Sequence, residues 1–381
     1  MKNRLDLKIC IAFLVVVSSF HDSFGQASKI ESDILRIMQK HEVVGMSVAV
    51  VKDGDIAYSK SFGLKDRENS VPLQEEDLFR IASISKSFSA TAIMQLVEAG
   101  KVSLQDDFSK LVGFRVRKPK FPETVITLKM VLSHTSSIND SQGYFELDVI
   151  DPSRNADWAK SYNDYEPGKG YRYCNLNFNM TGAVIERLSG ERFDSYIKNH
   201  ILKPLNLYGG YCVDSLNTNL FVTLYSYDSA GGFTPSPMAY ASRAEQMADY
   251  RMGYSTPIFS PTGGMKISAP DLARYMIMHM NRGSFEDTRI ISKRSSRTMQ
   301  KTVAKKAGYG LAITNVEDLI PGKTMTGHTG SAYGLYSALF FEPKEKFGFV
   351  VITNGCHPSE TDGMNTVLRT TINSLYDNFI R

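Results

Sequence analysis

The sequence has few cysteines and no long apolar run, and both shortages exclude whole classes of protein. Four cysteines occur in 381 residues, which is too few for a fold that depends on disulfide bonds. Beyond residue 25 only Cys174, Cys212 and Cys356 remain, so an exported chain could form at most one internal bridge. No apolar stretch approaches the roughly 20 residues of a membrane-spanning helix. The fold must therefore be stabilised by its hydrophobic core.

The chain also has little net charge. The formal net charge is +4, and about +3 remains when the first 25 residues, with three basic and two acidic side chains, are set aside. The chain contains no dense basic run and no internal repeat. These absences exclude the electrostatic surface that a nucleic-acid partner requires. The 42% apolar and 22% charged residues are typical of a globular protein.

The first residues, MKNRLDLKICIAFLVVVSSFHDSFGQ, are typical of a secretory signal peptide. Three basic side chains precede about a dozen apolar residues. Cleavage after Gly25 would leave small residues, Ser23 and Gly25, at the recognition positions. We expect a signal peptide over residues 1–25 and a periplasmic or secreted mature chain with no stable membrane span; a short uncleaved anchor is the alternative.

Apolar periodicity predicts strands at both ends of the chain and helices between them. Residues 45–51 and 56–63, joined by the turn KDGD, are typical of a β-hairpin. Residues 308–316, 334–343 and 347–355 are also strand-like. Helical periodicity occurs at residues 28–42, 128–134, 179–190, 192–202, 269–283 and 361–380.

This order of elements predicts a mixed α+β fold. We expect one antiparallel sheet, built from the N- and C-terminal segments and flanked by helices, with a mostly helical region inserted into it. A single domain would cover residues 26–381. Its α/β part would comprise about 26–80 and 265–381, and its helical part about 81–264.

Two long segments, 143–172 and 207–258, match no regular pattern. The first is polar and aromatic, and the second is rich in Tyr, Ser, Gly and Asn. Because long loops in compact proteins often carry binding sites, we expect at least one of them to border a cleft.

Lys86 is the unusual residue of the stretch RIASISKSFSATAI. In a helix it would share the inward face with Ala90, Ile93 and Val97. Burial of an unpaired ammonium lowers its pKa by up to several units. Ser83 lies one turn earlier on the same face. A partly desolvated, neutral lysine at this place could remove the serine proton and create a nucleophile.

The same spacing occurs a second time, at Ser195 and Lys198. Ser83 differs because it follows a strand-like segment and opens a helix, whose free N–H groups can stabilise a developing anion. Ser195 lies within a polar helix, where Lys198 is free to reach solvent. We therefore select Ser83 and Lys86 as the reactive pair.

Two further motifs supply groups that acyl transfer requires. Tyr173 and Asn175 follow the turn EPGKG and offer a phenol and a carboxamide. The same spacing at Tyr376 and Asn378 is assigned no role. The segment HTGS, residues 328–331, lies beside a predicted strand, and its glycine would let a substrate approach the backbone.

Other hydrolase and metal signatures are missing. The chain has no Gly-x-Ser-x-Gly motif. His41 and Glu42 have no second histidine four residues on, so the zinc-protease motif fails. No other cluster has metal-ligand spacing, and we expect neither a metal nor a cofactor. We interpret His134 as structural and Cys174 as a small buried side chain.

Together, the segments FRIASISK, ITLKMVLSHTSSI, PGKGYRYCN, PTGGMKISAPDLARYM and GHTGSAYGLYSALFFEPKEKFGFVVITN resemble the penicillin-recognising serine hydrolases. Within that group the sequence is most similar to class C β-lactamases, secreted DD-carboxypeptidases and their esterase relatives. The resemblance runs from about residue 45 to 355. It implies a β-lactamase/transpeptidase-like fold and an acyl-enzyme mechanism.

The resemblance also implies a role for each motif residue. Ser83 would be acylated, Lys86 would assist its deprotonation, and Tyr173 would pass a proton to the leaving group and later activate water. The backbone N–H groups of Ser83 and Ser331 would form the oxyanion hole. The residues implied to bind substrate are Asn175, His328, Thr329 and Gly330.

His328 stands where class C β-lactamases usually carry lysine. A histidine that is mostly neutral at pH 7 offers less fixed positive charge to a substrate carboxylate. The sequence therefore favours a DD-peptidase-like or esterase-like hydrolase, acting on a D-Ala-D-Ala-like peptide, a β-lactam or an ester. The alternatives are a class C β-lactamase and a penicillin-binding sensor with little turnover; the complete motif set disfavours a non-catalytic assembly protein.

Overall fold

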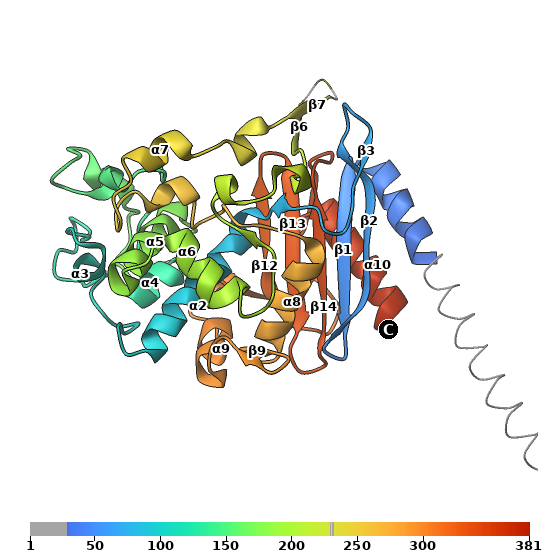
Figure 1. Ribbon diagram of the computed structural model, residues 1–381. Helices are drawn as coiled ribbons and strands as arrows, with labels where there is room; N and C mark the ends of the chain where they lie inside the picture. Colours follow the sequence, from blue (N-terminus) through green and yellow to red (C-terminus); the bar gives the residue numbers. More distant parts are fainter. Residues whose placement is uncertain (1–28, 229, 231) are drawn as a thin grey trace, which may run out of the picture.

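A seven-stranded antiparallel sheet forms one side of the molecule in the computed structural model, which describes residues 29–228, 230 and 232–381 (Figure 1). The strand order is β11-β12-β13-β14-β1-β2-β3, so segments from the two ends of the chain lie side by side. The strands are β1 (Gly45–Lys52), β2 (Asp55–Asp66), β3 (Val71–Pro72), β11 (Thr314–Val316), β12 (Met325–Ala332), β13 (Leu335–Glu342) and β14 (Phe347–Thr353).

Strands β1, β13 and β14 are mostly apolar because both faces of the sheet are covered. Successive side chains of a strand point to opposite faces. In β1, Val48 and Val50 therefore pack on one side, against α10 (Thr366–Phe379) and the helix at residues 29–40. Ala49 and Val51 belong to the larger core on the other side, which includes α8 (Ala269–Met280). The sheet is thus the middle layer between two hydrophobic cores.

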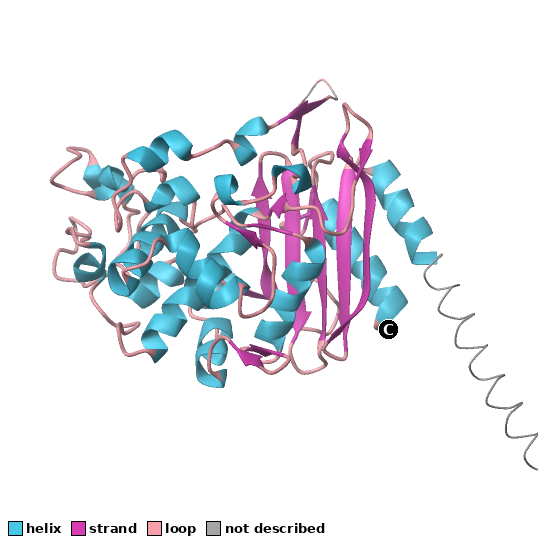
Figure 2. Cartoon of the chain, viewed as in Figure 1, coloured by secondary structure: helices cyan, strands magenta, loops and turns pink. Residues whose placement is uncertain are grey.

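Most helices gather beside the sheet rather than on it, as Figure 2 shows. They are α2 (Ser85–Glu98), α3 (Phe108–Val112), α4 (Leu128–Leu132), α5 (Asn175–Ser189), α6 (Phe193–Ile197), α7 (Ala244–Ala248) and α9 (Lys293–Gln300). Helix α2 runs from the sheet into this helical part and packs against α5. Along the described chain, no helix is both long and apolar enough to cross a bilayer.

Three small sheets lie between the first and last strands of the large sheet along the chain. The first has the strand order β4-β8-β5 and joins β4 (Phe79–Arg80) to β8 (Lys266–Ile267) and β5 (Gly209–Gly210). Two short hairpins complete the set: β6 (Tyr225–Tyr227) with β7 (Phe233–Pro235), and β9 (Ser284–Phe285) with β10 (Thr288–Arg289). The first sheet matters most, because β4 leads directly into the segment that carries Ser83.

The predicted mixed α+β fold, with its antiparallel sheet from both ends of the chain, is confirmed. The hairpin of β1 and β2 is confirmed as well. The strand predicted at residues 308–316 is mostly wrong: only Thr314–Val316 pairs with β12, because left-handed backbone at Gly308 and Ala312 turns the chain. The predicted signal peptide, residues 1–25, lies outside the described residues.

The C-terminal helix is also shorter than its periodicity suggested. It begins at Thr366, after a small hairpin of β15 (Glu360–Thr361) and β16 (Met364–Asn365). The Asn365 side chain accepts hydrogen bonds from the N–H groups of Val367 and Leu368, an N-cap that fixes the start of the helix.

Candidate active site

A pocket of about 460 Å³ lies where the helical part meets strand β12. Four of the residues selected from the sequence line it: Ser83, Tyr173, Asn175 and Ser331. Tyr144 and Phe145, from the long polar segment that follows residue 142, also line it. The prediction that one of the two irregular segments borders a cleft is therefore confirmed.

Ser83 is presented to this pocket by an abrupt turn. Strand β4 ends at Arg80, and a single 3₁₀ turn, Ala82–Ile84, precedes helix α2. Ala82 has φ 48°, a left-handed conformation that costs an L-residue roughly 1–2 kcal/mol. Such strain persists only where the surroundings hold the backbone firmly. The turn places the serine at the mouth of the helix, where N–H groups are free to stabilise an anion.

The surroundings that hold this turn are visible on strand β12. An added Cβ at Gly330 would lie 2.3 Å from the carbonyl oxygen of Ile81. The Ser337 hydroxyl donates to the same oxygen at 2.9 Å. The sequence argument for Gly330 was access for substrate, but the structure gives a different reason: only glycine lets β12 pack this closely against the turn that carries Ser83.

Lys86 is fully buried beneath Ser83, and its Nζ has three hydrogen-bond partners. They are Ser83 Oγ at 3.0 Å, Asn175 Oδ1 at 2.9 Å and Thr262 O at 2.9 Å. Burial lowers the pKa of Lys86 to about 7, although the charge of Asp140 opposes the shift. A substantial fraction of this amine is therefore neutral at pH 7, with a lone pair that can accept the serine proton.

Asp140, which the sequence analysis missed, arranges the start of helix α5. Its carboxylate accepts the N–H of Asn175 at 2.8 Å and that of Leu176 at 2.9 Å. It also accepts the carboxamide N–H of Asn175 at 3.1 Å and the Cys174 thiol at 3.1 Å. A negative charge at a helix N-terminus is favourable. The carboxamide oxygen of Asn175 is thereby turned towards Lys86.

Tyr173 lies over the same ammonium. Lys86 Nζ is 4.7 Å from the centre of its ring. Burial raises the pKa of Tyr173, and the nearby Ser83 hydroxyl opposes part of that change. Within the described part of the chain, the Tyr173 hydroxyl makes no hydrogen bond of ordinary geometry. A protonated phenol with no fixed partner is suited to donate a proton to a departing group.

His328 belongs to a cluster of rings behind Tyr173. Its Nε2 is 3.0 Å from the hydroxyl of Tyr309, and its ring centre is 6.1 Å from that of Tyr173. Burial, reinforced by the charge of Lys86, lowers the pKa of His328 to about 4. The imidazole is consequently neutral at pH 7. His328, Thr329 and Gly330 lie in β12, next to Ser331, but the pocket lining includes only Ser331 among these four.

His134 has the structural role that the sequence analysis expected. It is buried, and its Nδ1 accepts the N–H of Cys174 at 3.2 Å. Its ring packs 4.3 Å from that of Tyr173. These contacts fix the segment on which Tyr173 and Asn175 are carried. Cys174 itself is buried and its thiol is free, as are those of Cys212 and Cys356.

The rival serine–lysine pair lies away from this pocket. Ser195 belongs to α6, and Lys198, just beyond it, is exposed to solvent. Its ammonium therefore keeps its water. The exposure supports the choice of Ser83 and Lys86.

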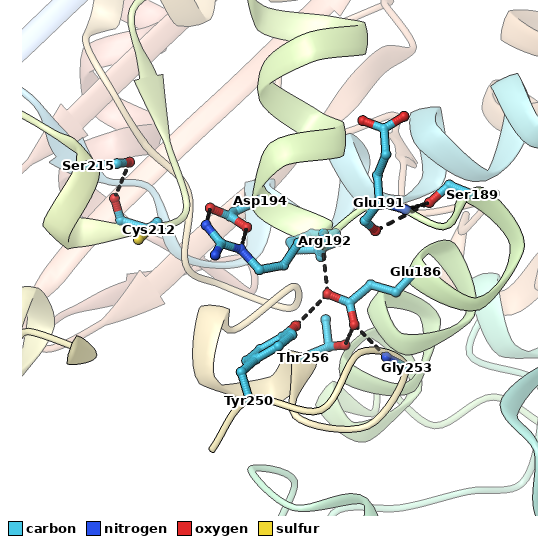
Figure 3. Close-up of polar contacts among 11 residues, drawn as sticks. Glu186, Ser189, Glu191, Arg192, Asp194, Cys212, Ser215, Tyr250, Gly253 and Thr256 are labelled. Atoms are coloured by element: carbon cyan, nitrogen blue, oxygen red, sulfur yellow. Dashed lines mark hydrogen bonds and ion pairs between the residues drawn. The ribbon is translucent and has the colours of Figure 1, made fainter. Parts of the chain in front are cut away.

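The far end of helix α5 holds a buried carboxylate, that of Glu186 (Figure 3). It accepts the N–H of Phe193 at 2.8 Å, the N–H of Gly253 at 2.6 Å and the hydroxyl of Thr256 at 2.8 Å. The Tyr250 hydroxyl is a fourth donor. These bonds attach the loop at residues 250–256 to α5. That loop leads to residues 260–263, which line the pocket.

Thr262 is another site residue that the sequence analysis missed. Besides its carbonyl contact with Lys86, its hydroxyl donates to Asn175 Oδ1 at 2.9 Å. Three distant segments, at residues 83–86, 175 and 262, therefore meet at one ammonium. The motif PTGGMKISAPDLARYM contains Thr262, so the signal was present in the sequence without an assigned role.

Comparison with known proteins gives a consistent result. The model of the Beta-lactamase family matches residues 30–371. Penicillin-binding protein 4 of Amycolatopsis lactamdurans is 27% identical over 336 residues, which cover 83% of this chain and 82% of that protein.

Solved structures show the same similarity. An octameric penicillin-binding protein homologue from Pyrococcus abyssi superposes with a TM-score of 0.72 at 27% identity, over 92% of this chain and 76% of that one. EstCE1, a hydrolase with promiscuous acyltransferase activity, gives a TM-score of 0.72 at 21% identity, over 94% of this chain and 100% of the other. At 21% identity, the similarity to EstCE1 is one of fold alone.

Proposed function

Because this chain belongs to the β-lactamase family of serine hydrolases, we propose that it cleaves an ester or amide bond through an acyl-enzyme on Ser83. The observation that carries the proposal is the hydrogen bond from Lys86 Nζ to Ser83 Oγ, made by a fully buried lysine. Burial keeps part of this amine neutral, which is the form that can act as a base.

Acylation follows from these positions. Neutral Lys86 accepts the Ser83 proton while Oγ attacks the substrate carbonyl, and the new C–O bond places a negative charge on the carbonyl oxygen. Backbone N–H groups of Ser83 and Ser331 would stabilise that charge. The C–O or C–N bond to the leaving group then breaks, and the leaving group takes a proton from Tyr173. Lys86 returns its proton to the phenolate.

Deacylation uses the same groups in reverse. Water takes the place of the leaving group, and its oxygen attacks the ester carbonyl while its proton passes through Tyr173 to neutral Lys86. The C–O bond to Ser83 then breaks, Oγ takes the proton from Lys86, and the acid product leaves. A sensor with little turnover would stop at the acyl-enzyme. The free phenol of Tyr173 favours turnover, because a group that only binds substrate does not need a second proton carrier.

Within the family, we favour an esterase-like activity, followed by a DD-peptidase-like one, over an efficient β-lactamase. The support comes from His328, which stands in place of a permanently charged lysine. Its lowered pKa leaves that end of the site without positive charge at pH 7. A leaving-group carboxylate, which penicillins and D-Ala-D-Ala peptides both carry, therefore gains little from it. An ester without such a carboxylate is the substrate that this observation supports best.

The decisive experiment compares substrates and follows Ser83 by mass spectrometry. Purified protein is incubated with nitrocefin, a D-Ala-D-Ala peptide, a D-amino-acid amide and a short-chain ester, with Ser83→Ala as the blank. We expect an adduct on Ser83 and steady release of product from the ester or the peptide. A single burst without later turnover would identify a sensor. Failure of every substrate to label Ser83 would refute the proposal.

We also propose that the protein is exported to the periplasm or beyond. The basic residues and apolar run before residue 25 support this proposal. Expression of the full chain, followed by N-terminal sequencing of the extracellular or periplasmic fraction, should find a chain that begins near Gln26. Recovery of only the uncleaved protein in the cytoplasm would contradict it.

A further inference from the structure

Arg80 is a buried cation in the lining of the catalytic pocket. It lies in strand β4, three residues before Ser83, and its side chain is 6% exposed. It borders the same pocket as Ser83, Asn175 and Tyr333. A guanidinium remains charged in proteins, so its burial requires compensation.

The hydrogen bonds of Arg80 supply only neutral acceptors. Nε donates to Gly263 O at 2.9 Å, Nη1 to Ala239 O at 3.2 Å, and Nη2 to Ser260 Oγ at 3.3 Å. A guanidinium has five N–H bonds. Two of those of Arg80 therefore have no acceptor among the described residues, and no described carboxylate forms an ion pair with it. The charge of Arg80 is left unneutralised.

In the part of the chain that the structure describes, the nearest neighbours of Arg80 supply no negative charge to balance it. Lys266 lies directly opposite Arg80 in the pairing of β4 with β8, and it is buried as well. Its ammonium donates to the carbonyl of Tyr211 at 2.6 Å. Burial, followed by the charge of Arg80, lowers the pKa of Lys266. Arg80 itself lies 5.0 Å from the ring centre of Tyr333, which covers the guanidinium with an aromatic face.

The side chains near the two ends of strand β12 therefore differ in charge. Towards the start of β12, His328 is neutral and lies in the ring cluster with Tyr309 and Tyr173. Just beyond the end of β12, Tyr333 meets the charged Arg80. Because Tyr173 gives its proton to the leaving group, the leaving group lies at the His328 end. The acyl part of the substrate then extends towards Arg80.

We propose that Arg80 binds a carboxylate carried on the acyl part of the substrate, so that the preferred substrates are esters or amides of acids with a second, anionic group. This inference rests on the proposed function. The free N–H bonds of the guanidinium suit the two oxygens of a carboxylate. Asn175, which the family resemblance implies as a ligand of the acyl side chain, lines the same pocket.

Matched esters test the inference on the intact protein. The 4-nitrophenyl monoester of adipic acid and 4-nitrophenyl hexanoate have acyl chains of equal length, and only the first carries a carboxylate. A second pair moves the charge to the leaving group: 4-hexanoyloxybenzoate and its methyl ester. We expect kcat/KM of the wild-type protein to be about ten- to hundredfold higher for the adipate ester than for hexanoate, with no preference within the second pair.

Substitutions at Arg80 then separate binding from a structural role. Arg80→Gln should lower kcat/KM for the adipate ester by about ten- to hundredfold, mainly through KM, and change that for hexanoate less than about threefold. Arg80→Lys, which keeps the charge but loses the planar fork, should be intermediate. Arg243→Gln is the control, because Arg243 lies near Arg80 and outside the pocket lining. It should leave the ratio of the two rates unchanged.

Several results would overturn the inference. Equal losses for both esters in Arg80→Gln would show a structural role alone, and a preference for the anionic leaving group would place the subsite elsewhere. If Arg80→Gln fails to fold, the wild-type protein still decides, because equal kcat/KM for the adipate and hexanoate esters contradicts the proposal. Labelling of Ser83 without any such preference would refute this inference alone. The absence of all labelling would refute the proposed function as well.

Discussion

The two ends of helix α5 are each held by a carboxylate. Asp140 accepts the N–H of Asn175 at the start of the helix, close to Lys86. Glu186, near the end of the helix, accepts the N–H of Gly253 from the loop at residues 250–256. Both carboxylates accept several hydrogen bonds, but Asp140 is only partly buried. Glu186 is 1% exposed and its four donors are two backbone N–H groups and two hydroxyls. At the Asp140 end, a cation is buried close by without direct contact with the carboxylate.

The difference shows how helix α5 can be anchored at one end by a structural network and border, at the other end, a titratable lysine of helix α2. The Glu186 carboxylate accepts four hydrogen bonds, all from neutral donors. A network that is satisfied in this way holds its members in place and contains no basic side chain. Lys86 instead has an amine whose two protonation states are close in free energy at pH 7, because burial and Asp140 act on its pKa in opposite directions. The first network holds the loop that leads to the pocket, and the second contains the base that the proposed function requires.

The largest expected effect is that of Lys86→Arg. Arginine keeps the positive charge but cannot become a neutral base. We expect the rate of Ser83 acylation to fall about a thousandfold or more, measured with an activated ester under single-turnover conditions. Lys198→Arg, at the exposed copy of the same spacing, should have the wild-type rate. A Lys86→Arg protein with nearly normal acylation would contradict the proposed activation.

A substitution at Glu186, near the opposite end of α5, should lower the stability of the fold. Glu186→Gln places an amide NH₂ against groups that are themselves donors. We expect the free energy of unfolding to fall by about 2–3 kcal/mol, measured by urea denaturation. The exposed Glu245→Gln on α7 should change it by less than about 0.5 kcal/mol. The pH dependence of the folded Glu186→Gln enzyme should match that of the wild type; a displaced profile would show that the two ends are coupled.

The acylation rate should depend on pH in one direction only. Lys86 acts as a base when it has lost its proton, and burial lowers its pKa to about 7. The rate should therefore fall about tenfold for each pH unit below 7 and reach a plateau above about pH 8. His328, with a pKa of about 4, should not titrate between pH 5 and 9. A bell-shaped profile within that range would contradict this assignment.

The smallest expected effect is a displacement of that profile. The carboxylate of Asp140 raises the pKa of Lys86, so Asp140→Asn should lower the midpoint of the pH–rate curve by about one unit. Cys174→Ala is the matched control, because it removes a hydrogen bond to Asp140 but keeps the Asp140 charge. Burial raises the pKa of the Cys174 thiol, so the thiol carries no charge of its own at pH 7. The midpoint of Cys174→Ala should stay unchanged. A midpoint that rises in Asp140→Asn would mean that the electrostatic interpretation has the wrong sign.

Several site residues could be found from the sequence because they occur in short motifs. Ser83 and Lys86 are one helical turn apart, so local geometry alone brings them together. Asp140 and Tyr309 could not be found in this way. Asp140 lies in an irregular loop, and Tyr309 lies in a segment that was interpreted as a strand. The position of each depends on contacts with β12 or α5, which no local pattern encodes.

Arg80 illustrates a signal that was present but not used. It stands in FRIASISK, between apolar residues that precede the reactive serine. A charged side chain within a buried strand needs a partner, and the sequence cannot say which groups surround it. In the structure the acceptors come from residues 239, 260 and 263, far along the chain.

By itself the sequence determined the apolar runs that build the central strands, the order of the motifs and the local pairing of Ser83 with Lys86. These properties depend on spacing along a few residues, and spacing is preserved whatever the rest of the chain does. Only the tertiary structure decided the protonation of Lys86 and the isolation of Arg80. Burial and hydrogen-bond partners set the free energy of a charge, and segments distant in sequence supply both when the chain packs.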